Sequence, residues 1–467
     1  MRKKIYLKKK NKASVRLKTG KVAGKAWIVA VNMGYGHQRT AYPLRNLSPD
    51  GKVINANDYE GIPKSDRNLW EGTRKSYEFI SNFKRIPLIG NFAFLALDTF
   101  QRILSFYPKR DLSKSNLAVK IIFSLVKRGW GRDLIEKLKN YNPPGLNLPV
   151  AQRKKEKPLP IITTFFTPAF MAAFLDYPGD VFCVICDADM TRAWVSDNPQ
   201  KSKIKYLAPT GRVVERLKLY GIKEHNIFFT GYPLPMDIVG DEKMKILKED
   251  LKYRILNLDP QKRYFQKYKD LIKKSLGNLP DKPDHPLTIM FSVGGAGAQK
   301  EIGAGILKSL APKIKAGQLK VVLAVGIKET VKKYFLENIE ILGLKSALKK
   351  NIAIVSGKDM ANYFQNFNEA LRKVDILWTK PSELSFYAAL GLPIIISPTI
   401  GSQEDFNKRW LIKSGFGIPQ ENPDYTDQWL FDWLNQGYLA EAAMQGFVEG
   451  EKLGTLKIKK IISSIKK

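Results

Sequence analysis

Glycine and polar residues gather in two loops whose chemistry suits a ligand with phosphate and hydroxyl groups. The first is the glycine loop, Gly294 to Ala298, which stands between an apolar run at Leu287 to Val293 and a helical pattern. Glycine lets backbone N–H groups approach a phosphate closely, and the dipole of the following helix favours its negative charge. The loop matches neither the GxxxxGK(S/T) motif nor GxGxxG, so it indicates neither an ATPase nor a dehydrogenase.

The second region is the stretch from Asp375 to Asn407, which predicts two buried parallel strands joined by a short helix. A right-handed crossover places the loops after both strands at one edge of the sheet, where each faces a helix N-terminus. The predicted parts are a strand at Asp375 to Trp378, a loop at Lys380 and Pro381, a helix capped by Ser382 that ends at Gly391, a strand at Pro393 to Ser397, and a polar loop with Gln403 and Glu404.

An imidazole group stands at a comparable place in the first part of the chain. Ala26 to Met33 is an apolar run typical of a buried parallel strand, and it ends in Gly34-Tyr35-Gly36-His37 before a helical pattern begins. Strand, glycine turn and helix would place His37 at the carboxyl edge of a sheet. We therefore expect a functional role for His37, although a lone histidine is commonly structural.

Cys183 and Cys186 have the spacing CxxC. A zinc site would need a second pair, or histidines at ligand spacing, and the three histidines of the chain do not provide them. Alternation along a strand would point the two thiols to opposite faces. We expect both cysteines to pack in the core of a protein from a reducing compartment.

The elements that would position these groups form two series of apolar runs alternating with helical patterns. This alternation predicts an α/β protein with two doubly wound parallel-sheet domains. Pro233 and Pro235 stop the first series. The expected divisions are a basic tail at 1–24, an N-terminal domain at 25–240 with a helical insertion at about 60–145, a basic helical connector at 241–285, a C-terminal domain at 286–425, and C-terminal helices at 426–467.

Lysine and arginine outnumber aspartate and glutamate by 78 to 44, which gives a formal charge of +34. This charge indicates nucleic acid, an anionic membrane or a phosphorylated substrate as partner, unless it only solubilises the surface. No nucleic-acid-binding motif supports the first of these. The apolar segment Ile86 to Arg110 suits either an interfacial helix or a buried insertion. Neither a signal-peptide pattern nor an uninterrupted membrane span is present in the sequence, so we expect a cytoplasmic protein.

The loops, taken in order, resemble those of one enzyme family. GYGHQRTA at Gly34 to Ala41 is similar to the glycine-histidine loop of monogalactosyldiacylglycerol synthases and of the N-acetylglucosaminyltransferase that makes the lipid-linked peptidoglycan precursor. Further resemblances follow in CVICDADMTRAWV from Cys183, GGAGA from Gly294, KDM from Lys358, and ALGLPIIISPTIGSQEDFN from Ala389. The resemblance implies the GT-B fold, with a central cleft between two Rossmann-like domains. It also implies inverting transfer from a UDP-sugar in the C-terminal domain to a lipid or lipid-linked acceptor in the N-terminal one.

Roles for individual residues follow from this resemblance. His37 would be the general base, since an imidazole accepts a proton at neutral pH. Asp187 is the second candidate for the base; alternatively, it orients His37 or the acceptor, or it only caps a helix. Asp189 completes a DxD, but the family needs no metal or other cofactor, because backbone N–H groups and helix dipoles can carry the diphosphate's charge. Gly34 and Gly36 would lie on the acceptor side. The donor-binding residues would be Gly294, Gly295, Gly297, Ala298, Gly357, Lys358, Met360, Ser382, Glu383, Gln403 and Glu404.

The sequence departs from the family pattern at the ribose. The family's ribose-binding glutamate falls on Phe386, and the preceding KPSE lacks the usual glycine. Glu383 stands three residues earlier and could reach the ribose instead. Two functions therefore stay open. One is a nucleotide-sugar glycosyltransferase, peripheral at the inner face of the plasma membrane. The other is a non-catalytic GT-B-like protein that binds anionic membrane or nucleic acid. A UDP-sugar 2-epimerase is less favoured, because no further acidic cluster surrounds the sugar site.

Overall fold

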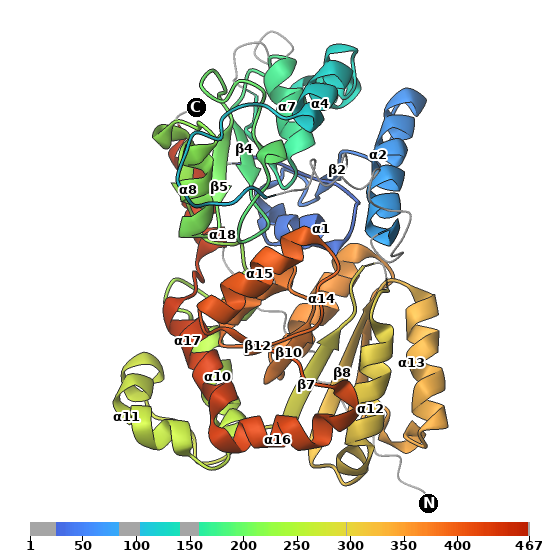
Figure 1. Ribbon diagram of the computed structural model, residues 1–467, viewed down its shortest axis with the longest axis vertical. Coiled ribbons are helices and arrows are strands. Elements are labelled where there is room, and N and C mark those ends of the chain that lie inside the picture. The colour runs from blue at the N-terminus through green and yellow to red at the C-terminus, as the bar shows by residue number, and fades with distance from the viewer. Residues whose placement is uncertain (1–24, 84–102, 141–157, 296, 466–467) are drawn as a thin grey trace, which may run out of the picture.

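Two parallel sheets form the centre of the protein (Figure 1). The structure, a computed structural model, describes residues 25–83, 103–140, 158–295 and 297–465. The N-terminal sheet has six strands in the order β2-β1-β3-β4-β5-β6, and the C-terminal sheet has six in the order β12-β11-β10-β7-β8-β9. The predicted fold class is confirmed: an α/β protein with two doubly wound domains, which is the arrangement of the GT-B fold.

Neighbouring strands run parallel in both sheets. The N-terminal strands are β1 (Trp27–Ala30), β2 (Ile54–Asn55), β3 (Ile161–Thr163), β4 (Val181–Val184), β5 (Lys205–Ala208) and β6 (Ile227–Phe229). The C-terminal strands are β7 (Leu287–Ser292), β8 (Leu319–Gly326), β9 (Ile352–Ser356), β10 (Ile376–Thr379), β11 (Ile394–Ile396) and β12 (Gly417–Pro419). The central strands are almost wholly apolar because helices cover both faces of each sheet.

Helices connect the strands. In the N-terminal part they are α1 (Tyr35–Ala41), α2 (Lys64–Phe83), α4 (Leu117–Lys127), α5 (Arg132–Asn140), α7 (Phe166–Phe174), α8 (Gly211–Leu219) and α9 (Met236–Val239). The C-terminal part has α10 (Lys245–Leu258), α11 (Arg263–Leu276), α12 (Lys300–Lys315), α13 (Glu329–Ile341), α14 (Met360–Leu371), the 3₁₀ helix η5 (Glu383–Leu390), α15 (Ser402–Lys413), α16 (Thr426–Gln436), α17 (Tyr438–Glu449) and α18 (Gly454–Ser464).

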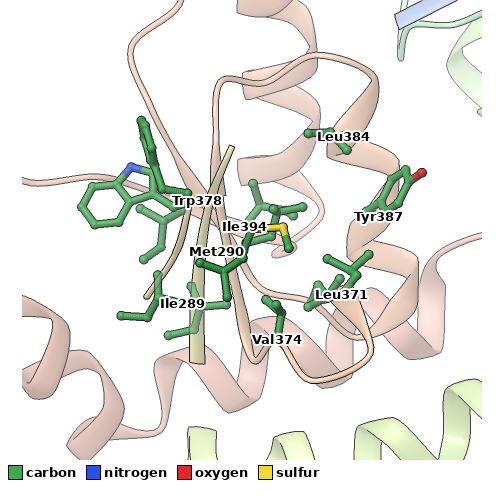
Figure 2. Packing of buried hydrophobic residues seen from close by; sticks show 14 of the residues in the cluster. Ile289, Met290, Leu371, Val374, Trp378, Leu384, Tyr387 and Ile394 are labelled. Atoms are coloured by element: carbon green, nitrogen blue, oxygen red, sulfur yellow. The ribbon is translucent and has the colours of Figure 1, made fainter. Parts of the chain in front are cut away.

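The core of the C-terminal domain lies around β7 and β10. Figure 2 shows Ile289 and Met290 of β7 packed with Trp378 of β10, Ile394 of β11 and Tyr387 of η5. Each of these five side chains is fully buried. The rigid core fixes the two loops that leave β7 and β10, which are the glycine loop and the Lys380 loop.

Two later segments, α10 and α18, pack into the cores of the domains, whereas the sequence indicated a connector and separate C-terminal helices. The predicted connector supplies α10, whose Leu247 and Leu251 pack in the same hydrophobic cluster as β7 and β10. Arg254 of α10 donates hydrogen bonds to the carbonyls of Val374 and Leu390, at 2.8 and 2.7 Å. The last helix, α18, packs through Ile458 and Ile462 on the N-terminal sheet. The first and the last described elements, β1 and α18, thus belong to the same domain.

Two predictions lie mostly or wholly outside the described residues: the basic tail at 1–24 and most of the apolar segment Ile86 to Arg110. The described parts of the insertion form α2, α4 and α5. Within the described ranges, no helix combines the length and the apolar character that a bilayer crossing requires.

Candidate functional site

The order of strands reverses between β1 and β3 in the N-terminal sheet and between β10 and β7 in the C-terminal sheet. Loops that leave adjacent strands in opposite directions at such a point open a crevice at the carboxyl edge of the sheet. His37 follows β1, and Thr164 follows β3. The glycine loop follows β7, and Lys380 follows β10. The topology therefore places the predicted groups at the two switch points.

His37 lies in the first turn of α1, and its proton is fixed on one nitrogen. Nδ1 lies 2.8 Å from the backbone carbonyl oxygen of Thr164. A carbonyl oxygen can only accept, so Nδ1 carries the hydrogen and the lone pair is on Nε2. Burial lowers the pKa of His37 to about 4, against the raising effects of the Thr164 carbonyl and of Glu383. The imidazole is thus neutral at pH 7, in the form that accepts a proton.

Two aromatic side chains, Phe165 and Trp194, pack near this imidazole. The ring of His37 lies 4.8 Å from that of Phe165 and 6.2 Å from that of Trp194, measured between centroids. The Phe165 ring is also 6.4 Å from Trp70. Trp70 borders a polar pocket of about 230 Å³, whose other lining residues are Asn32, Asn57, Asp58, Arg67 and Glu71. An apolar surface therefore adjoins the imidazole, and Phe165 and Trp70 lie between the imidazole and the polar pocket.

Cys186 belongs to this surrounding as well as to the core. Both cysteines are buried and free, as predicted. Cys186 Sγ, however, lies 3.6 Å from His37 Nδ1 and donates to the Thr164 carbonyl oxygen at 3.3 Å. The thiol supports the same carbonyl that orients the imidazole. Cys186 therefore packs in the core and also contacts the group that orients His37.

Asp187 follows β4 and is bound to the other domain. Asn407 of α15 donates to Asp187 Oδ1 at 3.0 Å and accepts from the Ala188 backbone N–H at 2.8 Å. Burial raises the pKa of Asp187 to about 6, the Asn407 hydrogen bond lowers it, and the nearby carboxylates of Glu383 and Glu404 raise it. The hydrogen bond that orients His37 comes from Thr164, so Asp187 does not need to supply it.

Asp189, the second aspartate of the DxD, faces away from these groups. Its two carboxylate oxygens accept from Nε and Nη2 of Arg216, each at 2.8 Å, and both side chains are buried. Its carboxylate is therefore occupied by α8. Among the residues that the structure describes, no three His, Cys, Asp or Glu side chains are grouped to hold a metal ion.

Glu383 forms a buried ion pair across the domain boundary. Its Oε1 accepts from Nε of Arg39 at 3.1 Å, and the two side chains are 9% and 3% exposed. Arg39 comes from α1, two residues after His37. Its guanidinium carbon lies 4.3 Å from the ring centroid of Phe367 and 4.7 Å from that of Phe364, both on α14. One carboxylate oxygen of the predicted ribose ligand is thus committed to Arg39.

Phe386, at the position where the family has its ribose-binding glutamate, is also buried at the boundary. Its ring stacks on Tyr232 with centroids 4.7 Å apart and an interplanar angle of 10°. The predicted ends of this helix are confirmed, with Ser382 at the N-cap position and Gly391 at the C-cap, but the Ser382 side chain makes no capping hydrogen bond and residues Glu383–Leu390 form a 3₁₀ helix. All eight of these residues are buried, so packing rather than capping sets their conformation.

Tyr35 brings the first glycine turn into contact with the C-terminal domain. Its hydroxyl accepts a hydrogen bond from the backbone N–H of Ile327 at 3.0 Å, just beyond β8. A Cβ atom at Gly295 would lie 3.3 Å from the Tyr35 ring, and Gly326 has no room for a Cβ beside the hydroxyl. Gly34 has φ +117°, a value that glycine adopts without strain. The turn that carries His37 therefore touches the glycine loop.

The Lys380 loop and the start of α15 meet beside the glycine loop. Lys380 Nζ lies 2.5 Å from Glu404 Oε1, and Glu404 Oε2 accepts from the Ile400 backbone N–H at 2.7 Å. A Cβ atom at Gly294 would lie 2.9 Å from Lys380 Cε. Gln403, in the first turn of α15, is partly exposed. Of the predicted donor residues, Gly295 and Glu383 thus contact α1, and Gly294 and Glu404 both contact Lys380.

The remaining predicted donor residues lie around this centre. Gly297, at φ +76°, and Ala298 continue the glycine loop and are partly exposed. Gly357 packs against the backbone of Tyr363, and its N–H donates to the Gly326 carbonyl at 3.2 Å. Lys358 is exposed, and Met360 begins α14. Gly36 lies beside the Glu383 carboxylate: a Cβ atom at Gly36 would be 3.3 Å from Glu383 Oε2.

Sequence reasoning missed Arg39, Asn407 and Lys380 as parts of the site. Asn407 is one helical turn after Gln403 and therefore lies on the same face of α15. Arg39 is a charged residue on the buried face of α1, inside the GYGHQRTA motif. A charge at a position where the helix pattern predicts burial is a signal that a partner exists.

Comparisons with known proteins found one family model that matches part of the chain and several solved structures of low identity. A family model described as a domain of unknown function (DUF6938) matches residues 280–352. None of the curated proteins compared with the sequence matches it. Among solved structures, Acinetobacter baumannii MurG is 14% identical over 94% of this chain and 100% of its own, with a TM-score of 0.45.

S. aureus MnaA, solved with UDP, is 14% identical over 75% of this chain and 80% of its own, with a TM-score of 0.41. Anabaena HepE, also solved with UDP, is 12% identical over 76% of this chain and 98% of its own, with a TM-score of 0.39. Likenesses of this size assign no activity to this chain. The function must be argued from the residues of the site.

The depressed pKa of His37 predicts a loss of stability in weak acid. The unfolded chain binds a proton near pH 6.5, whereas the native imidazole binds it only near pH 4. As pH falls through this window, the free energy of unfolding should drop by up to about 1.4 kcal/mol per pH unit from this group. Urea denaturation at several pH values should show a shallower slope for His37→Gln. His225→Gln, at an exposed histidine, should keep the wild-type slope; equal slopes for all three proteins would contradict the burial effect on His37.

Replacing Arg39 with Met should destabilise the protein strongly. The change leaves the Glu383 carboxylate buried without its cation, which costs about 3–5 kcal/mol for pairs of this kind. Lys345→Met is the matched control, because Lys345 pairs with Glu340 while both side chains are largely exposed, and it should cost less than about 1 kcal/mol. Urea denaturation measures both. If Arg39→Met and Lys345→Met cost the same, the interdomain pair is not important for stability.

Proposed function

We propose that this protein is an inverting glycosyltransferase that moves a sugar from a nucleotide-sugar, specifically a UDP-sugar, to a lipid or lipid-linked acceptor. The observation that carries the proposal is the neutral imidazole of His37, with its lone pair on Nε2, on a turn that touches the glycine loop through Tyr35 and Gly295. A proton acceptor and a phosphate-binding loop from different domains are the two parts that such a transfer requires.

In the proposed reaction the acceptor hydroxyl gives its proton to His37 Nε2 while its oxygen attacks the anomeric carbon of the sugar. The bond between that carbon and the diphosphate oxygen breaks, and its electron pair leaves with the diphosphate. Attack from the opposite face inverts the anomeric configuration. The Thr164 carbonyl, which accepts from Nδ1–H, stabilises the imidazolium that forms. Asp187 is the second candidate for the base, and its pKa of about 6 suits that role.

The donor would lie against the C-terminal domain. The glycine loop, Gly294, Gly295, Gly297 and Ala298, would lie against the diphosphate, with the α15 N-terminus and Ser382 opposite. The Gly297 N–H donates to the Gly294 carbonyl at 2.8 Å and closes this loop, which leaves the other N–H groups to face the ligand. Gln403 and Glu404 would bind the sugar hydroxyls, Glu383 the ribose, and Gly357, Lys358 and Met360 the base. Glu404 is already oriented for this, because one of its oxygens accepts from the Ile400 N–H.

The acceptor would approach from the N-terminal domain, past Gly34 and Gly36. Phe165, Phe166 and Trp194 offer an apolar surface beside His37, which suits a lipid portion. The polar pocket at Trp70 offers amide and charged groups for a hydroxylated head group. With the formal charge of +34, this arrangement favours a place at the anionic inner face of the plasma membrane.

His37→Ala tests this function. We expect UDP to raise the melting temperature of the wild type and of the variant alike, because the nucleotide contacts the other domain. UDP release from UDP-N-acetylglucosamine, UDP-glucose or UDP-galactose, measured with a membrane lipid extract as acceptor, should fall about 10²–10⁴-fold in the variant. His225→Ala, at an exposed histidine, should release UDP at the wild-type rate.

Three results would change the interpretation. Full activity of His37→Ala would move the role of base to Asp187, which Asp187→Asn then tests. Stabilisation by GDP- or dTDP-sugars instead of UDP-sugars would change the donor. If no nucleotide shifts the melt while nucleic acid or anionic vesicles do, the protein is a non-catalytic binder and the enzyme proposal is wrong.

A further inference from the structure

Lys380 lies across the glycine loop because of the sheet register. Strands β7 and β10 are neighbours, and Ser292 pairs with Thr379. The residues that follow them, Val293 and Gly294 on one strand and Lys380 on the other, are therefore side by side. The aliphatic part of the Lys380 side chain passes through the space that a side chain at position 294 would occupy. A Cβ atom at Gly294 would lie 2.9 Å from Lys380 Cε and 3.7 Å from Lys380 Nζ. Gly294 thus makes room for the lysine as well as for a ligand.

The ammonium group of Lys380 stands among carboxylates. It contacts Glu404 at 2.5 Å, and its charge lowers the pKa of Asp187. Glu383 is the second carboxylate near Asp187 after Glu404, and its positive partner, Arg39, is enclosed by aromatic rings. An anionic ligand in this place meets repulsion from carboxylates unless a cation compensates it. The Lys380 side chain is 24% exposed, so a ligand can reach it, whereas Arg39 is 3% exposed.

We propose that Lys380 binds the diphosphate of the nucleotide-sugar and neutralises the charge that develops on it as the sugar leaves. This inference rests on the proposed function and adds a catalytic residue to it. When the bond to the anomeric carbon breaks, the β-phosphate oxygen takes the electron pair, and the Lys380 ammonium faces that charge without giving up a proton. A fixed cation at such a point favours the transition state over the bound donor.

The ion pair between Lys380 and Glu404 couples phosphate binding to sugar binding. Glu404 keeps its hydrogen bond from the Ile400 N–H when the ammonium turns toward a phosphate. Its other oxygen is then available to a sugar hydroxyl. Phosphate binding and sugar binding are therefore linked through one ion pair.

Binding of UDP and of uridine to Lys380→Met tests the inference, with isothermal titration calorimetry on the full chain. The two ligands differ only in the diphosphate. We expect the variant to bind UDP about 10–100-fold more weakly and uridine with unchanged affinity, and to release UDP from the donor about 10²–10³-fold more slowly. Lys380→Arg should keep most of the UDP affinity. Glu404→Gln, which removes the partner but keeps the lysine, should bind UDP no more weakly than the wild type.

Lys413→Met is the control, because Lys413 is an exposed lysine on α15 and its loss should change neither affinity. Unchanged UDP affinity and turnover in Lys380→Met would overturn the inference and leave the proposed function intact. An equal loss of UDP and uridine binding would overturn it too, since it would show a structural role. If the wild type itself binds no UDP, the proposed function fails, and this inference fails with it.

Discussion

The buried ion pair between Arg39 and Glu383 links α1 of the N-terminal domain to η5 of the C-terminal domain. Both charges are removed from water: Nε of Arg39 bonds Glu383, the guanidinium packs on aromatic rings, and Nη1 is buried without a hydrogen-bond partner. Arg39 shares a short helix with His37. A contact that holds Arg39 in the C-terminal domain therefore also fixes the imidazole relative to the glycine loop.

The other polar side chains of the site are also each held by one partner. Thr164 orients His37, Asn407 holds Asp187, and Glu404 holds Lys380. Each of these partners stands in a loop after a strand or at the start of the helix that follows one. Parallel sheets put such positions at one edge, and two facing edges put them in one place. A site that uses both His37 and the glycine loop needs both domains, because the first lies in the N-terminal domain and the second in the C-terminal domain.

Burial sets the protonation states within this cluster. It keeps His37 neutral and brings Asp187 close to half protonation near pH 6. A second buried pair, Asp189 with Arg216, removes the other aspartate of the DxD from the site and ties it to α8. Two aspartates only two residues apart thus have different roles, since one faces the domain boundary and the other faces the N-terminal core.

The sequence by itself determined the two parallel sheets, the glycine loop, and the placing of His37 and Asp187 after strands, because apolar runs and glycine turns are local patterns. Only the tertiary structure decided the partners: Arg39 and Glu383 are 344 residues apart, and Asn407 and Asp187 are 220 apart. It also replaced the helix capped by Ser382 with a wholly buried 3₁₀ helix. Local spacing cannot encode such outcomes, because they depend on which buried charges and surfaces meet once both domains have folded.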